Sequence, residues 1–150
     1  MSASCTTTVS SCGNYLVSRI CIPNVYQGDN ANIPLTLLDK AGNPLDLNTL
    51  NEIEVLIYGL DKDYSLQYTW PDTTGDETID IIQTGTGTSM TDKGVISLYL
   101  PPEFTTNLVS GDLFATIRIK RDTAVTGREE IITFGCVIIG NIKYTELNFQ

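Results

Sequence analysis

The stretch that decides the fold covers residues 26–58 and has the sequence YQGDNANIPLTLLDKAGNPLDLNTLNEIEVLIY. Gly28 predicts a turn at its start, because glycine adopts positive φ without steric cost. Apolar residues then alternate with polar ones over residues 31–37, and again over residues 53–57. Residues 39–44 lie between these runs and contain Gly-Asn-Pro, which suits a tight turn and little else. The stretch therefore predicts two half-buried strands joined by a turn and a short apolar anchor.

The rest of the chain repeats this alternation and lacks a helical period. The further predicted strands are residues 15–22, 64–70, 79–83, 96–100, 113–119 and 130–139. Only residues 101–107 favour a helix, and that helix is a single turn. About eight or nine strands at intervals of roughly eight to twelve residues predict an antiparallel β-sandwich.

Two of these predicted strands have unusual features. Pro34 has no amide donor, so it favours an edge strand or a bulge. The run from Phe134 to Ile139 is apolar at every position, which predicts a strand covered on both faces by its own domain or by another subunit.

The chain has 150 residues and is expected to form one domain. Residues 1–14 are rich in Ser, Thr and Cys and have little to bury, so they are assigned as an N-terminal arm that becomes ordered only when it is docked. Residues 15–140 form the sandwich. Residues 141–150 mix polar and apolar side chains and are assigned as a C-terminal arm.

The net charge is −9, from 9 basic and 18 acidic residues, which disfavours binding to nucleic acid. The sequence has no run of about 20 apolar residues, so neither a transmembrane helix nor a membrane partner is expected. Arg118, Lys120, Arg121 and Arg128 gather around one predicted strand. They predict either a solvated strand end or a salt-bridging patch that faces an acidic partner.

The sequence has no histidine, which removes the commonest general base and the commonest metal ligand. Cys5, Cys12, Cys21 and Cys136 form no C-x-x-C pair, and a zinc site would need unusually wide spacing. They are expected to be buried or weakly exposed thiols, and no secretory signal is expected at the N-terminus. Synthesis in a reducing cytosol is therefore expected, without a requirement for disulfides.

Two further groups of side chains leave alternatives open. The carboxylates are Asp61, Asp63, Asp72, Asp76, Glu77 and Asp80; they predict solvated loops, with an acid/base pair or a calcium site at residues 72–80 as alternatives. Tyr58, Tyr64, Tyr68 and Trp70 are expected to fill the core or its rim, with stacking on sugar rings as the alternative. No nucleophile motif is present, so no catalytic, cofactor-binding or metal residue is assigned and no enzyme is expected.

The order of turn residues and strand residues in this chain resembles that of a known class of modules. Gly28-Asp29, Gly42-Asn43-Pro44, Leu45-Asp46-Leu47, Val55 to Ile57 and Gly111-Asp112-Leu113 together resemble the immunoglobulin-like modules of tailed-bacteriophage virions. The pattern is similar to the N-terminal domain of upper baseplate proteins.

The resemblance implies an immunoglobulin-like sandwich and a structural role in the virion, either as an auxiliary capsid protein or as a tail or connector adaptor. Such a subunit would be assembled in the host cytoplasm. It would dock on a symmetrical assembly through its arms and edge strands. Its partners would be other virion proteins, namely capsid, portal, ring or tail subunits, with copies of itself as a further candidate. A carbohydrate-binding or adhesin module is the alternative function.

Overall fold

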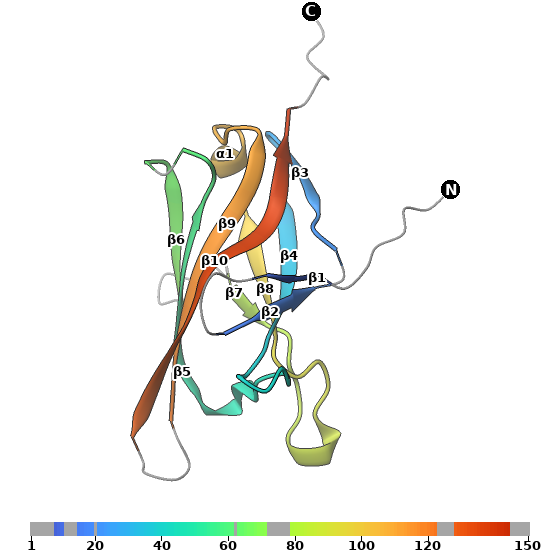
Figure 1. The fold of residues 1–150 in the computed structure, drawn as a ribbon, viewed down its shortest axis with the longest axis vertical. Helices are drawn as coiled ribbons and strands as arrows, with labels where there is room; N and C mark the ends of the chain where they lie inside the picture. The colour runs from blue at the N-terminus through green and yellow to red at the C-terminus, as the bar shows by residue number, and fades with distance from the viewer. Residues whose placement is uncertain are drawn as a thin grey trace, which may run out of the picture.

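The computed structural model describes residues 8–10, 15–19, 21–61, 63–71, 79–122 and 128–144. These residues form two five-stranded sheets that pack together (Figure 1). The strand order is β1-β2-β4-β8-β7 in sheet A and β3-β10-β9-β5-β6 in sheet B. Buried apolar side chains from both sheets meet in one core cluster. The predicted all-β sandwich is confirmed at this level.

The elements have the following bounds. Sheet A contains β1 (Thr8–Ser10), β2 (Val17–Arg19), β4 (Ala31–Leu37), β7 (Ile79–Ile81) and β8 (Val95–Leu100). Sheet B contains β3 (Asn24–Tyr26), β5 (Leu50–Tyr58), β6 (Ser65–Trp70), β9 (Gly111–Asp122) and β10 (Glu129–Lys143). The short helices are η1 (Leu47–Thr49), η2 (Gly87–Ser89) and α1 (Pro102–Thr105). All described strand pairs are antiparallel except β3 with β10.

Residues 31–58 form the two predicted strands and the turn between them. β4 and β5 each bury every second side chain, and those buried side chains belong to one core cluster. In the turn between them, Gly42 has φ +87 and donates its N–H to the carbonyl of Asp39 at 3.0 Å. Positive φ is the conformation that glycine adopts readily, which explains why the turn forms at this position.

The predicted first strand is wrong as a single element. The chain pairs in sheet A as β2 up to Arg19 and pairs in sheet B as β3 from Asn24 onward. Pro23 lies in the crossing and has no N–H to offer a ladder, but its carbonyl accepts from the N–H of Asn141 at 2.9 Å. This split, with β1 as a further short strand, brings the described total to ten strands in place of the eight or nine expected.

Pro34 lies beside a free edge of β4. Leu37 donates its N–H to Gly94 at the β8 side of β4, and neighbouring residues of a strand direct their N–H groups to opposite edges. The donor that Pro34 lacks would therefore face the β2 side. There, β2 pairs only with the last two residues of β4. β4 as a whole lies between β2 and β8, but no described strand pairs with residues 31–35 on the β2 side.

The described part of the chain does not cover both faces of the last strand, and cover by another subunit stays a prediction. Phe134, Val137 and Ile139 are buried, but Cys136 is exposed. The pairing of β10 with β9 shifts between Phe134 and Val137, where Cys136 has φ +49, so Gly135 and Cys136 form a bulge. The bulge restores the alternation, because one extra residue returns Val137 to the inner face. An apolar run that looks two-faced in sequence therefore serves mainly one face.

The strands extend beyond the expected sandwich boundaries. β1 lies inside the expected N-terminal arm and pairs with β2, while β10 continues to Lys143, inside the expected C-terminal arm. The other parts of both arms, residues 1–7, 11–14 and 145–150, lie outside the described residues. No helix in the described part of the chain is long and apolar enough to cross a membrane.

The cysteines differ from the prediction. Cys21 and Cys136 both belong to disulfide bonds, and both are exposed, so the expectation of buried or weakly exposed thiols is wrong for them. Cys5 and Cys12 lie outside the described residues. Disulfides persist in oxidising surroundings, which include the surfaces of virions as well as secreted proteins.

Candidate functional site

The outward face of sheet B carries an apolar patch, which we define as Leu56, Tyr58, Phe114 and Ile138. Tyr58 lies opposite Phe114, and Phe114 lies opposite Ile138, so the side chains form one row across three strands. The rings of Tyr58 and Phe114 stack with their centroids 5.7 Å apart. Leu56 is 38% exposed and lines a shallow hollow of about 240 Å³ with Tyr58, Ser65 and Thr116. Leu56 is exposed and the other three side chains are half-buried, so the patch is a candidate docking surface.

A charged patch continues the same face, formed by Glu52, Glu54, Arg118 and Lys120. The Nζ of Lys120 lies 2.9 Å from Glu52 and 3.8 Å from Glu54. Hydrogen bonding to Glu52, with the charge of that carboxylate, raises the pKa of Lys120. Arg118 lies opposite Glu54, but within the described residues it forms no ion pair shorter than 4 Å. The patch therefore presents both signs of charge to a partner.

The other predicted basic residues are placed separately. The Nε of Arg121 donates to Glu130 at 2.9 Å, on the hairpin formed by β9 and β10. Arg128 lies just before β10. The salt bridges that Lys120 and Arg121 form are with carboxylates of this same chain. Solvent screens such exposed pairs, so they organise the surface more than they stabilise the fold. An acidic partner for this cluster stays a hypothesis.

The four predicted aromatic side chains do not form one platform. Tyr68 and Trp70 lie opposite Val55 and Ile53 and pack against the core, whereas Tyr58 lies on the outward face. Tyr64 stacks on Phe104 at 5.1 Å, and its hydroxyl donates to the carbonyl of Phe104 at 3.1 Å. Stacking on a sugar needs exposed rings that share a face. The described structure therefore offers no specific support for the carbohydrate alternative.

The candidate carboxylates are also dispersed where the structure describes them. Asp61 accepts the backbone N–H of Asp63 at 3.1 Å, which closes a turn before β6. Asp80 lies on β7, in the other sheet. Asp72, Asp76 and Glu77 lie outside the described residues. Among the residues that are described, no group of three or more His, Cys, Asp or Glu could hold a metal ion.

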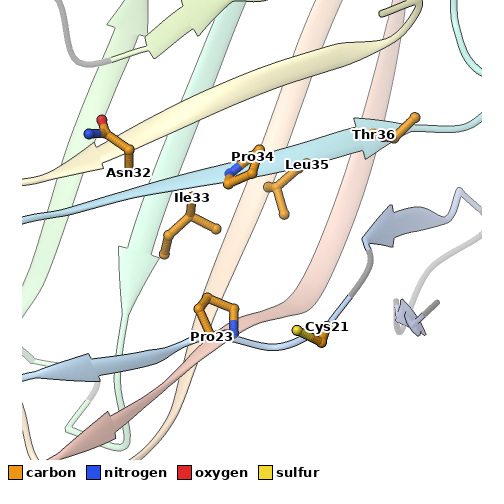
Figure 2. A pocket seen from close by; sticks show the side chains of 7 residues that line it. All are labelled: Cys21, Pro23, Asn32, Ile33, Pro34, Leu35 and Thr36. Carbon is orange, nitrogen blue, oxygen red and sulfur yellow. The ribbon is translucent and has the colours of Figure 1, made fainter. Parts of the chain in front are cut away.

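A second hollow, of about 330 Å³, opens beside the free edge of β4 (Figure 2). It is lined by Cys21, Pro23, Asn32, Ile33, Pro34, Leu35 and Thr36. Figure 2 shows Ile33 and Leu35 pointing from β4 toward the crossing segment that carries Cys21 and Pro23. Among the described residues, β2 pairs only with Thr36 and Leu37, so no described strand lies between the first half of β4 and the crossing segment.

A buried polar network lies at the base of the loops that follow β4 and β7. Gln83 is 7% exposed, and its Oε1 accepts the N–H groups of Leu47 at 2.9 Å and Gly94 at 3.0 Å. Its Nε2 donates to Asp46 at 3.0 Å. The pKa of Asp46 is lowered chiefly by the backbone N–H of Asn48, with help from Gln83 and against the effect of burial. These contacts hold two distant loops in one arrangement.

Sequence reasoning missed the apolar patch and the role of Gln83. In β5 the outward positions run Glu52, Glu54, Leu56, Tyr58, and this change from charged to apolar was the available signal. Gln83 lies four positions after buried Ile79, and in a strand such residues lie on the same face, so this spacing would have placed the amide of Gln83 inside the sandwich. Comparison with known proteins finds no family model that matches the chain and no matching curated protein.

Proposed function

We propose that this protein is a non-enzymatic structural subunit of a tailed-phage virion, with an immunoglobulin-like sandwich as its body. It acts as an auxiliary capsid protein or as a tail or connector adaptor that docks on a symmetrical assembly. The observation that supports this role best is the outward face of sheet B, where the apolar patch adjoins the charged patch. The turn and strand pattern of residues 26–58 supplies the resemblance to phage modules.

The apolar patch has the composition of an interface centre. Tyr and Phe are enriched at such centres because they bury large areas with few rotatable bonds. The row of Tyr58, Phe114 and Ile138 spans β5, β9 and β10, which are the three central strands of sheet B. The pairing of β9 with β5 and with β10 positions these side chains, so little order has to be gained on docking.

The charged patch suits the rim of the same interface. Glu52, Glu54 and Lys120 already form ion pairs, and Arg118 adds a further positive charge beside them. Charges at a rim select the partner and the register of contact more than they add affinity. A face with an apolar centre and a two-signed rim is a suitable attachment surface for a subunit that occupies one repeated position on a ring or shell.

The proposal is tested by incorporation into particles. Tailed-phage particles purified from the cells that encode the chain should contain it by mass spectrometry, at a copy number matching a symmetric ring or shell. Leu56→Glu places a charge in the apolar patch at a side chain that is already 38% exposed, so the fold is retained and incorporation should fall about tenfold or more. Asn43→Glu, in the exposed turn before β5, is the matched control and should incorporate normally.

Two results would overturn the proposal. The first is that the chain is missing from purified particles. The second is that Leu56→Glu enters particles as readily as Asn43→Glu, since the apolar patch would then have no part in attachment. Circular dichroism and the thermal midpoint of both variants verify that each retains the wild-type fold.

A further inference from the structure

The free edge of β4 offers backbone groups beside an apolar hollow. Leu37 directs its N–H to Gly94, so by alternation the N–H and C=O of Asn32 and the C=O of Pro34 face the opposite edge. No described strand pairs there. The hollow of about 330 Å³ opens along this edge, with Ile33 and Leu35 contributing its apolar wall. An edge of this kind accepts an extended segment that adds as a strand and places alternate side chains in the hollow.

The sequence that follows β10 has the pattern of such a segment. Residues 145–150 have the sequence TELNFQ, in which Leu147 and Phe149 alternate with Glu146, Asn148 and Gln150. A strand formed here would have one apolar face and one polar face. It contains neither Gly nor Pro, so each of its residues can supply a backbone N–H to a ladder.

We propose that residues 145–150 of a second copy of this chain add as a strand to the free edge of β4 and insert Leu147 and Phe149 into the hollow. The inference rests on the proposed function, because it names how neighbouring subunits of the assembly hold each other. Backbone hydrogen bonds to Asn32 and Pro34 would give affinity. The two apolar side chains would fix the register.

The direction of β10 favours a second copy over the same chain. Asn141 donates to Pro23, a wall residue of the hollow, and β10 then runs parallel to β3 through Lys143. The strand therefore passes the level of the hollow and moves away from it. Residues 143–147 have the sequence KYTEL and contain no turn-forming Gly, Pro, Asn or Asp, so the pattern favours continued extension. If these residues are extended, they would point toward the β4 edge of a neighbouring copy.

The proposed contact allows two kinds of closed assembly. Two copies that exchange these segments reciprocally form a two-fold dimer, while one-way donation around a rotation axis forms a ring. In both, each copy gives one segment and accepts one, so the number of filled hollows equals the number of subunits. The test therefore does not depend on which symmetry is present.

Isotope-mixed crosslinking tests the contact directly. Full-length chain is prepared with a photocrosslinking phenylalanine analogue at position 149, in unlabelled and ¹⁵N-labelled forms, which are mixed, irradiated and digested. Crosslinks between position 149 of one isotope and residues 31–36 of the other are expected. Crosslinks confined to one isotope would overturn the second copy as occupant. Crosslinks that avoid residues 31–36 would overturn the hollow as the site.

Self-association supplies a second, independent measurement. Analytical ultracentrifugation should show reversible oligomers whose dissociation constant rises about tenfold or more for Phe149→Asp. Asn148→Asp adds the same charge one residue away, on the polar face, and should leave the dissociation constant unchanged. Equal effects of the two substitutions, or a chain that stays monomeric at about 1 mM, would overturn the inference.

The two proposals can fail separately. A chain that enters particles normally with Phe149→Asp, and shows no interchain crosslink, retains the proposed function and loses only this inference. A chain that exchanges its segment in solution yet is missing from particles shows the opposite result.

Discussion

Replacing Gln83 with alanine tests whether the buried amide holds the two loops together. Its Oε1 is the acceptor for two buried backbone N–H groups, those of Leu47 and Gly94. Leaving a buried donor unsatisfied costs about 1–3 kcal/mol, so Gln83→Ala should lower the free energy of unfolding by about 2–5 kcal/mol. For a chain of this length, that corresponds to a fall in Tm of roughly 5–15 °C. Urea denaturation and differential scanning calorimetry measure both quantities.

A matched control and a second substitution sharpen this test. Gln67→Ala removes the same side chain from an exposed position on β6 and should change the free energy of unfolding by less than about 0.5 kcal/mol. Gln83→Glu keeps an acceptor for both N–H groups but replaces the donor to Asp46 with a second carboxylate. That variant should be destabilised at neutral pH and should recover as the pH falls and one carboxyl is protonated. The reasoning is refuted if Gln83→Ala is as stable as Gln67→Ala.

Three further predictions follow from the core, the loops and the cysteines. Because the pKa of Asp46 is lowered in the folded state, its carboxylate stabilises the fold above the unfolded-state pKa, and this contribution is lost as the pH falls through the folded-state pKa. The stability advantage of wild type over Asp46→Asn should therefore shrink below roughly pH 4. An advantage that grows on acidification would contradict this expectation. Phe134 is fully buried, so Phe134→Ala should cost about 3–5 kcal/mol in urea denaturation, and a cost under about 1 kcal/mol would show that the bulge does not seat it in the core. Cys21 and Cys136 should resist alkylation by iodoacetamide until a reductant is added, as measured by intact mass. Reduction should lower the free energy of unfolding by about 2–4 kcal/mol. Rapid alkylation of either cysteine in the untreated chain would refute the disulfides.

The sequence predicts those parts of the fold in which local pattern and tertiary position agree. β4, β5, β8 and β9 alternate without interruption, and each buries the side chains that its period selects. The bulge in β10 could not be predicted, because it changes which face the following side chains point to without any distinctive residue type. In the sequence, Gly135 and Cys136 look like two more positions of an apolar run. Likewise, the split at Pro23 depends on which sheet the chain joins next, and that choice is made by contacts far along the sequence.

The candidate surfaces also have one part that the sequence predicts and one part that only strand pairing creates. Glu52 and Glu54 followed by Leu56 and Tyr58 show in sequence that one outward face changes character, so half of the apolar patch was accessible to pattern reasoning. Its other half, including Phe114, becomes adjacent only when β9 pairs with β5. The hollow beside β4 has no local signal beyond Pro34. It exists because the crossing after β2 leaves the edge uncovered, which is a property of topology.

The parallel pairing of β3 with β10 has a consequence for biosynthesis. β3 is made among the first strands and β10 is the last, yet Asn24 pairs with Asn141 and Gln27 donates to Lys143. On a ribosome that extends the chain by about 5–20 residues per second, sheet B therefore stays open at both β3 and β9 until its final strand has been released. Chains whose translation stops early would expose two bare strand edges at once, and such edges invite aggregation. Sheet B therefore closes only after β10 has been made, so a copy truncated before β10 should aggregate more readily than one that contains it.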